Sequence, residues 1–457
     1  MIAFSFIQKI FMQKNTVVLI HGYAEKGESF QIWKSKLEAR GYNVKVLGYT
    51  SLSDEVTLKD IAEGFERALH LPGGLKTDEP FDVIVHSTGM LVIRTWLALY
   101  PQQRHRLKHL IGLAPASFGS PVAHKARSWV GRLMRSNREW GEDFFENGYR
   151  ILDALELGSW YIWDLAHKDL LDDKSIYMNN NEPPYVFIFC GTSEYTGLKK
   201  MLRQPGSATD GTVRWAGCSL NTRKITIDLT KPPQYSNQIE IGEWRNATLL
   251  PMAPIVGLNH ATILKQPTDE LVEMVDAALQ VSKEYSSQDW YDKFYKGAVK
   301  LEYERIAHWQ QFIVRTVDEN GDAIPSYTLQ LVTKVSGEYK TIEGIELDEH
   351  LYTTDTSLRC FQVNIKPLKT KKVEKIYLKI SASSGSRLVI YKGYTAKENQ
   401  NNTGTWEGEI DLTDILQNSE KQILQPLTTT LIELRLNREP QEQGVEANNK
   451  VSWFLST

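Results

Sequence analysis

The segment Val83-Ile84-Val85-His86-Ser87-Thr88-Gly89-Met90-Leu91 decides the fold of this 457-residue chain. Its first three residues are apolar and β-branched, as in a buried strand of a parallel sheet. A helix is predicted from residue 90 to 99, so Ser87 falls on the short turn between a strand and a helix. A turn of this kind presents the serine hydroxyl at the edge of the sheet, beside the backbone N–H groups at the helix start.

On both sides of this segment, short apolar runs alternate with amphipathic stretches. Strands are predicted at residues 16–20, 44–47, 81–85, 110–113 and 185–189, and helices at 30–41, 60–69, 90–99 and 268–281. The helical stretches space their large apolar residues three or four positions apart, as Phe30, Trp33 and Leu37 show. This alternation predicts a mostly parallel sheet with helices on both faces.

The segment around Ser87 resembles the nucleophile elbow of the α/β-hydrolase family, in particular its lipase and esterase branch with an H-S-x-G core. Val85 stands where the family motif G-x-S-x-G has its first glycine, so a tight elbow requires a small residue opposite Val85. Gly89 lets the helix pack closely on the neighbouring strand. The resemblance covers residues 16–280, and it implies the α/β-hydrolase fold with Ser87 as the nucleophile.

The segment His21-Gly22-Tyr23 follows the first predicted strand and resembles the oxyanion loop of the family. The resemblance implies that the backbone N–H groups of Tyr23 and Thr88 stabilise the negative charge that develops on the substrate. His21 and Gly22 are then supporting residues of this loop, and we expect His21 to hydrogen-bond neighbouring loop segments.

The acid and the base of the family follow the nucleophile in chain order. Thr209-Asp210-Gly211-Thr212-Val213 resembles the D-G-x-V segment of the family, which makes Asp210 the preferred acid. Glu194, soon after the strand predicted at 185–189, is the competing acid. His260 lies on a glycine-containing loop before a helix and is the preferred base, since His308 and His350 lie beyond the first domain. The resemblance therefore implies a Ser87, Asp210 and His260 triad.

The predicted domains are an α/β-hydrolase catalytic domain at residues 1–304 and a β-sandwich-like domain at 305–457. Residues 116–184 interrupt the strand and helix alternation with a mostly helical stretch that contains Trp129, Trp140, Trp160 and Trp163. We expect this stretch to form a helical cap over a ligand cleft. The alternative is a satellite core. After residue 305, short strand-like runs separated by turn signals predict an all-β domain.

The expected activity is that of a serine hydrolase for carboxylic esters, with lipid or long acyl esters as the favoured substrates. The helix expected at 122–135 has an apolar face and several basic residues, which suits a lipid surface as well as packing against the sheet. The β domain is a docking module for lipid or a protein partner, or a structural cover, and residues 366–372 are its strongest basic cluster. The alternative functions are an acyltransferase with the same triad and a non-catalytic scaffold.

The composition excludes several other classes of protein. With 41% hydrophobic and 24% charged residues the chain is neither disordered nor a coiled coil, and its net charge of −3 gives no overall field that would attract nucleic acid. Three widely spaced cysteines, Cys190, Cys218 and Cys360, predict buried thiols and no disulfide framework. We expect no metal or organic cofactor in the reaction, because the triad needs none.

The N-terminal residues make a poor secretory signal. Residues 2–7 are apolar, but Lys9 follows at once and no small-residue cleavage site comes after it. No apolar run approaches the roughly 20 residues that a membrane-spanning helix needs. We therefore expect a cytoplasmic protein, with Met12 as a second candidate start and with peripheral membrane contact through the cap or the β domain.

Overall fold

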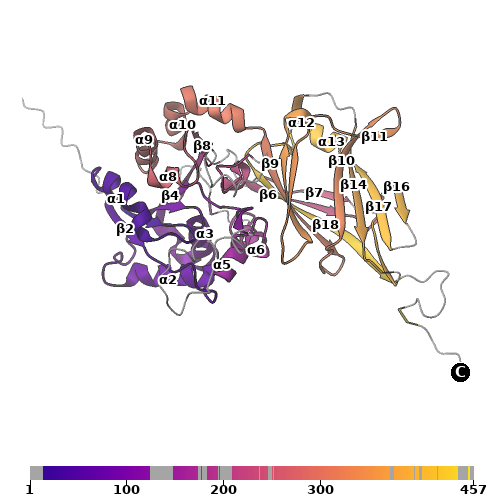
Figure 1. Cartoon of the computed structure of the whole chain (residues 1–457), viewed down its shortest axis with the longest axis horizontal. Coiled ribbons are helices and arrows are strands. Elements are labelled where there is room, and N and C mark those ends of the chain that lie inside the picture. The colour runs from indigo at the N-terminus through magenta and orange to yellow at the C-terminus, as the bar shows by residue number, and fades with distance from the viewer. Residues whose placement is uncertain are drawn as a thin grey trace, which may run out of the picture.

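The computed structural model has a parallel-sheet domain and a β domain that lie side by side (Figure 1). It describes residues 14–123, 148–172, 176–177, 183–193, 195, 208–235, 237–244, 250, 252–370, 375–386, 388–395, 397–400, 404–418, 420–440 and 451–452.

The first domain is built on a six-stranded parallel sheet with the strand order β2-β1-β3-β4-β5-β8. Its strands are β1 (Thr16–Ile20), β2 (Asn43–Leu47), β3 (Phe81–His86), β4 (Leu107–Leu113), β5 (Tyr185–Gly191) and β8 (Met252–Ile255). Five of these six were predicted, and β8 was not, because its four residues include a proline.

Helices cover both faces of this sheet, because alternate residues of each strand enter two different cores. Val83 and Val85 of β3 pack on one side with helices α2, α3, α5 and α6, and Ile84 packs on the other side with α1, α9 and α10. These helices are α1 (Gln31–Glu38), α2 (Leu58–His70), α3 (Gly89–Leu99), α5 (Tyr149–Leu155), α6 (Trp160–Asp169), α9 (Asp269–Ala278) and α10 (Ser287–Phe294). The predicted parallel sheet with helices on both faces is confirmed.

One antiparallel sheet and one mixed sheet form the β domain. One has five strands in the order β11-β10-β14-β17-β16, and the other has the order β12-β13-β9-β18-β6-β7, with β15 paired to β18. The strands are β6 (Thr222–Asp228), β7 (Ile239–Ile241), β9 (Trp309–Asp318), β10 (Tyr327–Val335), β11 (Glu338–Thr341), β12 (Leu347–Leu351), β13 (Leu358–Asn364), β14 (Ile376–Ser383), β15 (Val389–Lys392), β16 (Lys397–Gln400), β17 (Thr405–Asp411) and β18 (Thr429–Pro440). Their inner faces share one hydrophobic core, as expected for a sandwich.

The boundary between the two parts differs from the sequence division at residue 304. The strands β6 and β7 precede β8 in the chain, yet β6 pairs in parallel with β18 of the β domain. Figure 1 shows both strands in magenta among the orange and yellow strands of that domain. Ile225 and Ile227 explain this placement, because they alternate with polar residues and point into the core of the sandwich.

The β domain also contacts the helices that follow β4. Trp160 of α6 donates its indole N–H to Asp355 Oδ2 at 2.7 Å, and the Arg315 guanidinium lies 4.2 Å from the centre of its ring. Glu156, directly after α5, has a fully buried carboxylate that accepts the backbone N–H of Thr353 at 2.9 Å. These contacts fix the described part of the predicted cap against the β domain. Residues 124–147, which include most of the amphipathic helix expected at 122–135, lie outside the described residues.

Candidate active site

Ser87 lies between β3 and α3 on a sharp turn. Its backbone has a φ of +52°, in the left-handed region that a non-glycine residue seldom adopts. The turn is held from two sides, because the Ser87 N–H donates to the Leu113 carbonyl at 3.3 Å and its carbonyl accepts the N–H of Ala116 at 3.0 Å. Strain of this kind is common where a side chain must be held in one orientation for function.

Glycines make room for this turn. A Cβ on Gly89 would lie 2.5 Å from the Ile20 carbonyl oxygen, so only glycine allows α3 to approach β1 this closely. Opposite Val85, in the neighbouring strand, stands Gly112. Gly112 is the small residue that the family motif requires when its first glycine is replaced by valine. A Cβ on Gly22 would lie 2.9 Å from Ser87 Cβ, so the loop after β1 also passes close to the serine.

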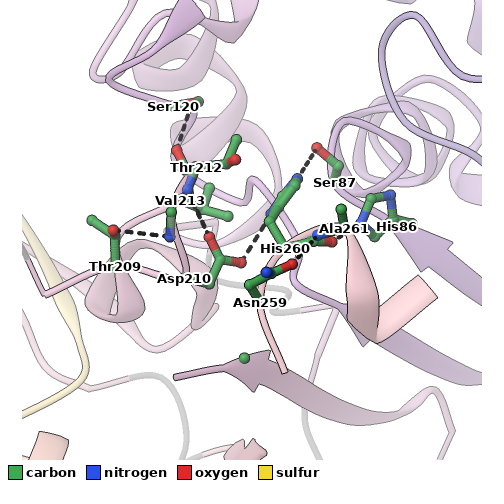
Figure 2. A network of polar contacts seen from close by, with 12 residues as sticks. His86, Ser87, Ser120, Thr209, Asp210, Thr212, Val213, Asn259, His260 and Ala261 are labelled. Atoms are coloured by element: carbon green, nitrogen blue, oxygen red, sulfur yellow. Dashed lines mark hydrogen bonds and ion pairs between the residues drawn. The ribbon is translucent and has the colours of Figure 1, made fainter. Parts of the chain in front are cut away.

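The structure brings Ser87, His260 and Asp210 into one hydrogen-bonded chain (Figure 2). His260 Nε2 lies 3.0 Å from Ser87 Oγ, and His260 Nδ1 lies 2.9 Å from Asp210 Oδ2. Asp210 is fully buried, whereas His260 and Ser87 keep 7% and 9% of their surface exposed. Because the carboxylate only accepts, Nδ1 carries the proton and Nε2 is free to accept the serine hydroxyl proton.

The turn around Asp210 orients its carboxylate toward the histidine. Oδ1 accepts the backbone N–H groups of Thr212 at 3.0 Å and Val213 at 2.8 Å, which leaves Oδ2 for the imidazole. The Asp210 carbonyl also accepts the His260 N–H at 3.0 Å, so the loops of Asp210 and His260 are joined through their backbones. Glu194, the competing acid in the sequence prediction, lies outside the described residues.

The loop that carries His260 is fixed by its neighbour Asn259. The Asn259 side-chain oxygen accepts the N–H groups of Ala261 at 3.1 Å and Thr262 at 3.0 Å, where the short helix α8 (Thr262–Lys265) begins. Figure 2 shows this cap directly beneath the imidazole. The helix start therefore holds the histidine loop without using the imidazole itself.

The loop after β1 brings Gly22 close to Ser87, and Tyr23, the expected oxyanion donor, is the next residue in this loop. His21 stacks on Tyr49, with their ring centres 4.0 Å apart, and the Tyr49 hydroxyl donates to the His21 carbonyl at 2.6 Å. His21 Nδ1 lies 2.9 Å from the Gly22 carbonyl, so this histidine has a supporting place in the loop. Thr88, the other expected donor, stands at the start of α3.

Sequence reasoning missed an ion pair that ties this loop to the elbow. Glu25 Oε2 accepts the Gly22 N–H at 2.9 Å and lies 2.9 Å from His86 Nδ1. His86 Nε2 in turn lies 2.9 Å from the carbonyl of His260. Burial opposes the charge on Glu25, but His86 outweighs this and lowers the pKa of Glu25 to about 2. Burial likewise opposes the charge on His86, whose pKa is raised by Glu25.

The β domain supports the acid loop from its far side. The side-chain amide of Gln362 in β13 donates to the Ala208 carbonyl at 3.2 Å, two residues before Asp210. Arg214 has a fully buried side chain whose guanidinium contacts Asp348 Oδ2 at 2.5 Å and Cys360 Sγ at 3.6 Å. No signal in the sequence links these residues, because their partners are more than 130 positions away.

Other expectations from the sequence concern the thiols, metals and membranes. All three cysteines are buried and free, as predicted, and burial raises the pKa of Cys360 to about 12. The described residues contain no group of three or more His, Cys, Asp or Glu side chains arranged to hold a metal ion. Among the helices that the structure describes, none combines the length and apolar character needed to cross a bilayer.

The parallel sheet, the elbow after β3 and the second β domain together define an α/β-hydrolase fold with a C-terminal β-sandwich domain, as the sequence predicted. Among the solved structures with this fold is a bacterial phospholipase, and nearly all of its chain superposes on this one. Phospholipase PlaB from Legionella pneumophila superposes with a TM-score of 0.72 at 22% identity, over 95% of this chain and 96% of PlaB.

Two further solved structures also match. PlaB in complex with thio-NAD superposes with a TM-score of 0.72 at 22% identity, over 96% of this chain and 98% of that chain. The mature lipase BlEst2 from Bacillus licheniformis has a TM-score of 0.37 at 13% identity, over 58% of this chain and 93% of that chain. No protein-family model matches the sequence, and neither does any curated protein.

Proposed function

We propose that this protein is a serine hydrolase that cleaves carboxylic esters of lipids or other long acyl chains through Ser87, His260 and Asp210. The observation that carries this proposal is the buried hydrogen-bonded chain that joins the three side chains on a strained elbow. The fold shared with a phospholipase supports the choice of lipid esters over small soluble ones.

The geometry supports a mechanism in two halves. His260 Nε2 takes the Ser87 hydroxyl proton as Oγ attacks the ester carbonyl, and Asp210 holds the Nδ1 proton and stabilises the imidazolium that forms. The imidazolium then gives its proton to the leaving alcohol oxygen, which releases the alcohol and leaves an acyl-enzyme. In the second half, water gives a proton to His260 and attacks the acyl carbon, and Ser87 recovers its proton as the acid leaves.

The Tyr23 and Thr88 N–H groups are the proposed donors to the tetrahedral oxyanion. Each donor of this kind contributes roughly 3 to 4 kcal/mol to stabilising the transition state. The ion pair between Glu25 and His86 supports this role, because Glu25 fixes the backbone of Gly22 next to Tyr23. The oxyanion loop is then held rigid before substrate binds, which is what this form of catalysis requires.

Labelling with a fluorophosphonate probe tests the proposal. We expect the wild-type protein to be labelled at Ser87, and Ser87→Ala to stay unlabelled, when labelled peptides are mapped. An ester panel of increasing acyl length would then show higher kcat/KM for long chains. An unlabelled wild-type protein, in the presence of detergent or liposomes, would support a scaffold without turnover.

Product analysis separates hydrolysis from acyl transfer. Both reactions pass through the same acyl-enzyme, and they differ in whether water or an alcohol attacks it. A hydrolase yields only free acid when an alcohol acceptor is added at moderate concentration, whereas a transferase yields a new ester. Free acid as the main product in both conditions is the expected result.

A further inference from the structure

The β domain contains an apolar cavity of about 150 Å³ between its two sheets. Twenty side chains line this cavity, and all of them are apolar: eighteen are Ile, Leu or Val and two are Phe. An aliphatic lining offers water no hydrogen-bond partners, and a cavity of this size accommodates apolar molecules that fit it. The lining therefore selects a ligand with an aliphatic part.

Residues of two short helices, α12 (Lys366–Thr370) and α13 (Thr413–Gln417), line one end of the cavity. Figure 1 shows both helices at the same end of the β domain. Leu368 of α12 and Leu416 of α13 contribute to its lining. The two sheets supply the walls, through residues such as Leu378 and Ile432. The helices thus form the roof of the cavity, and the strands form its sides.

The opposite end of the same sandwich is closed by its own side chains. Further along the same strands, Ile380 of β14 and Leu436 of β18 are buried, together with Trp406 of β17. At the roofed end, Leu378 and Ile432 occupy the same faces of these strands but remain partly exposed. The space under the helices is therefore a local feature of this end and does not reflect loose packing throughout the domain.

The roof carries positive charge. Lys366 and Lys369 lie on α12 on either side of Leu368, at the surface of the domain. Partial burial of Lys369 lowers its pKa, and burial together with the charges of Lys366 and Lys369 lowers the pKa of His308.

The acidic groups on the facing helix are fewer. Asp414 of α13 is exposed, and Asp411, just before this helix, already pairs with Lys375 at 3.3 Å. The two roof helices therefore carry two lysines against one aspartate, and their net positive charge attracts an anionic group.

We propose that this cavity binds the aliphatic tail of one long-chain fatty acid, with the carboxylate among the lysines of α12. The aliphatic lining matches an unbranched chain, its volume takes the end of one chain and leaves no space for a second, and the lysines match a carboxylate. The site is separate from Ser87, and the inference does not depend on the proposed hydrolysis.

Photo-crosslinking locates the bound fatty acid directly. The full chain carrying Ser87→Ala is irradiated with a palmitate analogue that bears a diazirine near its tail, and the labelled peptides are mapped. We expect saturable labelling of peptides from β10 and α13, which unlabelled palmitate suppresses and phosphatidylcholine vesicles do not. We also expect the affinity for saturated fatty acids to rise about fourfold for each added methylene until the tail fills the cavity.

Two substitutions test the tail and the carboxylate separately. Leu416→Trp fills the cavity from its roof and should reduce the labelling at least fivefold. Lys369→Glu should weaken palmitate binding about twofold to fivefold, whereas Lys340→Glu, at an exposed position on β11, should not change it. If a thermal melt shows that Leu416→Trp is not folded, palmitate binding by Lys369→Glu serves as the test of the proposal.

Three results would each overturn the proposal. The first is labelling confined to peptides of the parallel-sheet domain. The second is a folded Leu416→Trp variant, or a Lys369→Glu variant, that binds palmitate as the parent does. The third is better competition by phosphatidylcholine than by palmitate. None of these results affects the proposed hydrolysis, because Ser87 is already absent from the tested protein.

Discussion

The buried ion pair between Arg94 and Asp169 joins α3, the helix that follows Ser87, to α6, and its contribution to stability can be measured. Arg94 lies on α3 directly after the nucleophile turn, and Asp169 ends α6. Arg94 Nε lies 2.7 Å from Asp169 Oδ2 and Nη2 lies 2.9 Å from Oδ1, and both side chains are fully buried. Burial opposes the charge on Arg94, but Asp169 outweighs it and raises the pKa of the guanidinium. Arg94 stays charged even when this partner is lost, because a guanidinium is not deprotonated in proteins.

Asp169→Asn keeps the side-chain volume and removes the countercharge. A buried charge left without its partner destabilises a protein by about 3 to 5 kcal/mol. The matched control is Asp164→Asn on the same helix, where the pair with Lys168 is 54% and 55% exposed and is worth about 0.3 to 0.5 kcal/mol. The expected difference between the two variants is thus about 3 kcal/mol or more in the free energy of unfolding.

Urea denaturation followed by tryptophan fluorescence measures this difference. With an m-value of about 3 kcal/mol per M, the midpoint of Asp169→Asn should fall by about 1 M or more. The midpoint of Asp164→Asn should stay within about 0.2 M of wild type on the same m-value. Equal midpoints for the two variants would refute the reasoning, because they would show that water reaches the Arg94 guanidinium.

Three other substitutions test the site. Gly89→Ala should lower the free energy of unfolding by roughly 1 to 3 kcal/mol, because the new Cβ would lie 2.5 Å from a backbone oxygen of β1, and an unchanged melting temperature would contradict this. Asp348→Asn leaves the buried Arg214 guanidinium unpaired, and we expect about tenfold slower fluorophosphonate labelling; an unchanged rate would mean that the β domain does not position the acid. Glu25→Gln should flatten the pH dependence of unfolding at both ends. Because the pKa of Glu25 is lowered, its carboxylate stabilises the fold above pH 4.5, and this stabilisation is lost as the pH falls toward 2. Because the pKa of His86 is raised, its imidazolium stabilises the fold below pH 6.5, and this stabilisation is lost as the pH rises through the raised pKa.

The sequence predicted the parallel sheet well, because its signals are local. β1 spans the residues predicted for it, and β3 and β5 extend theirs by one and two residues. Each of these strands is rich in apolar residues and buried on both faces, which is the strongest pattern that a strand offers. No helix was predicted between residue 281 and the β domain, although α10 starts at Ser287 with a capping box between Ser286 and Asp289.

The residues that hold the candidate site could not be found in the same way. Ser87, Asp210 and His260 stand in local sequence motifs. The residues next to Glu25 and Asp348 in the sequence form no motif and are of the kinds found in any exposed loop or strand. The roles of Glu25 and Asp348 depend on partners that folding brings from 61 and 134 positions away. Composition and periodicity describe one segment at a time, so contacts between distant segments leave no trace in them.

The path of the chain explains why the loop of Asp210 contacts the second domain. After Asp210 the chain leaves the parallel sheet, forms β6 beside β18, and returns through β8 before it reaches His260. The acid and the base are therefore separated by a strand that is itself part of the sandwich, and Gln362 and Arg214 join the same sheet to the acid loop. Removing the β domain would take away the partner strand of β6 as well as these contacts. The strand β6 belongs to the sandwich and lies in the chain between Asp210 and His260. The β domain is therefore part of the framework of the candidate active site.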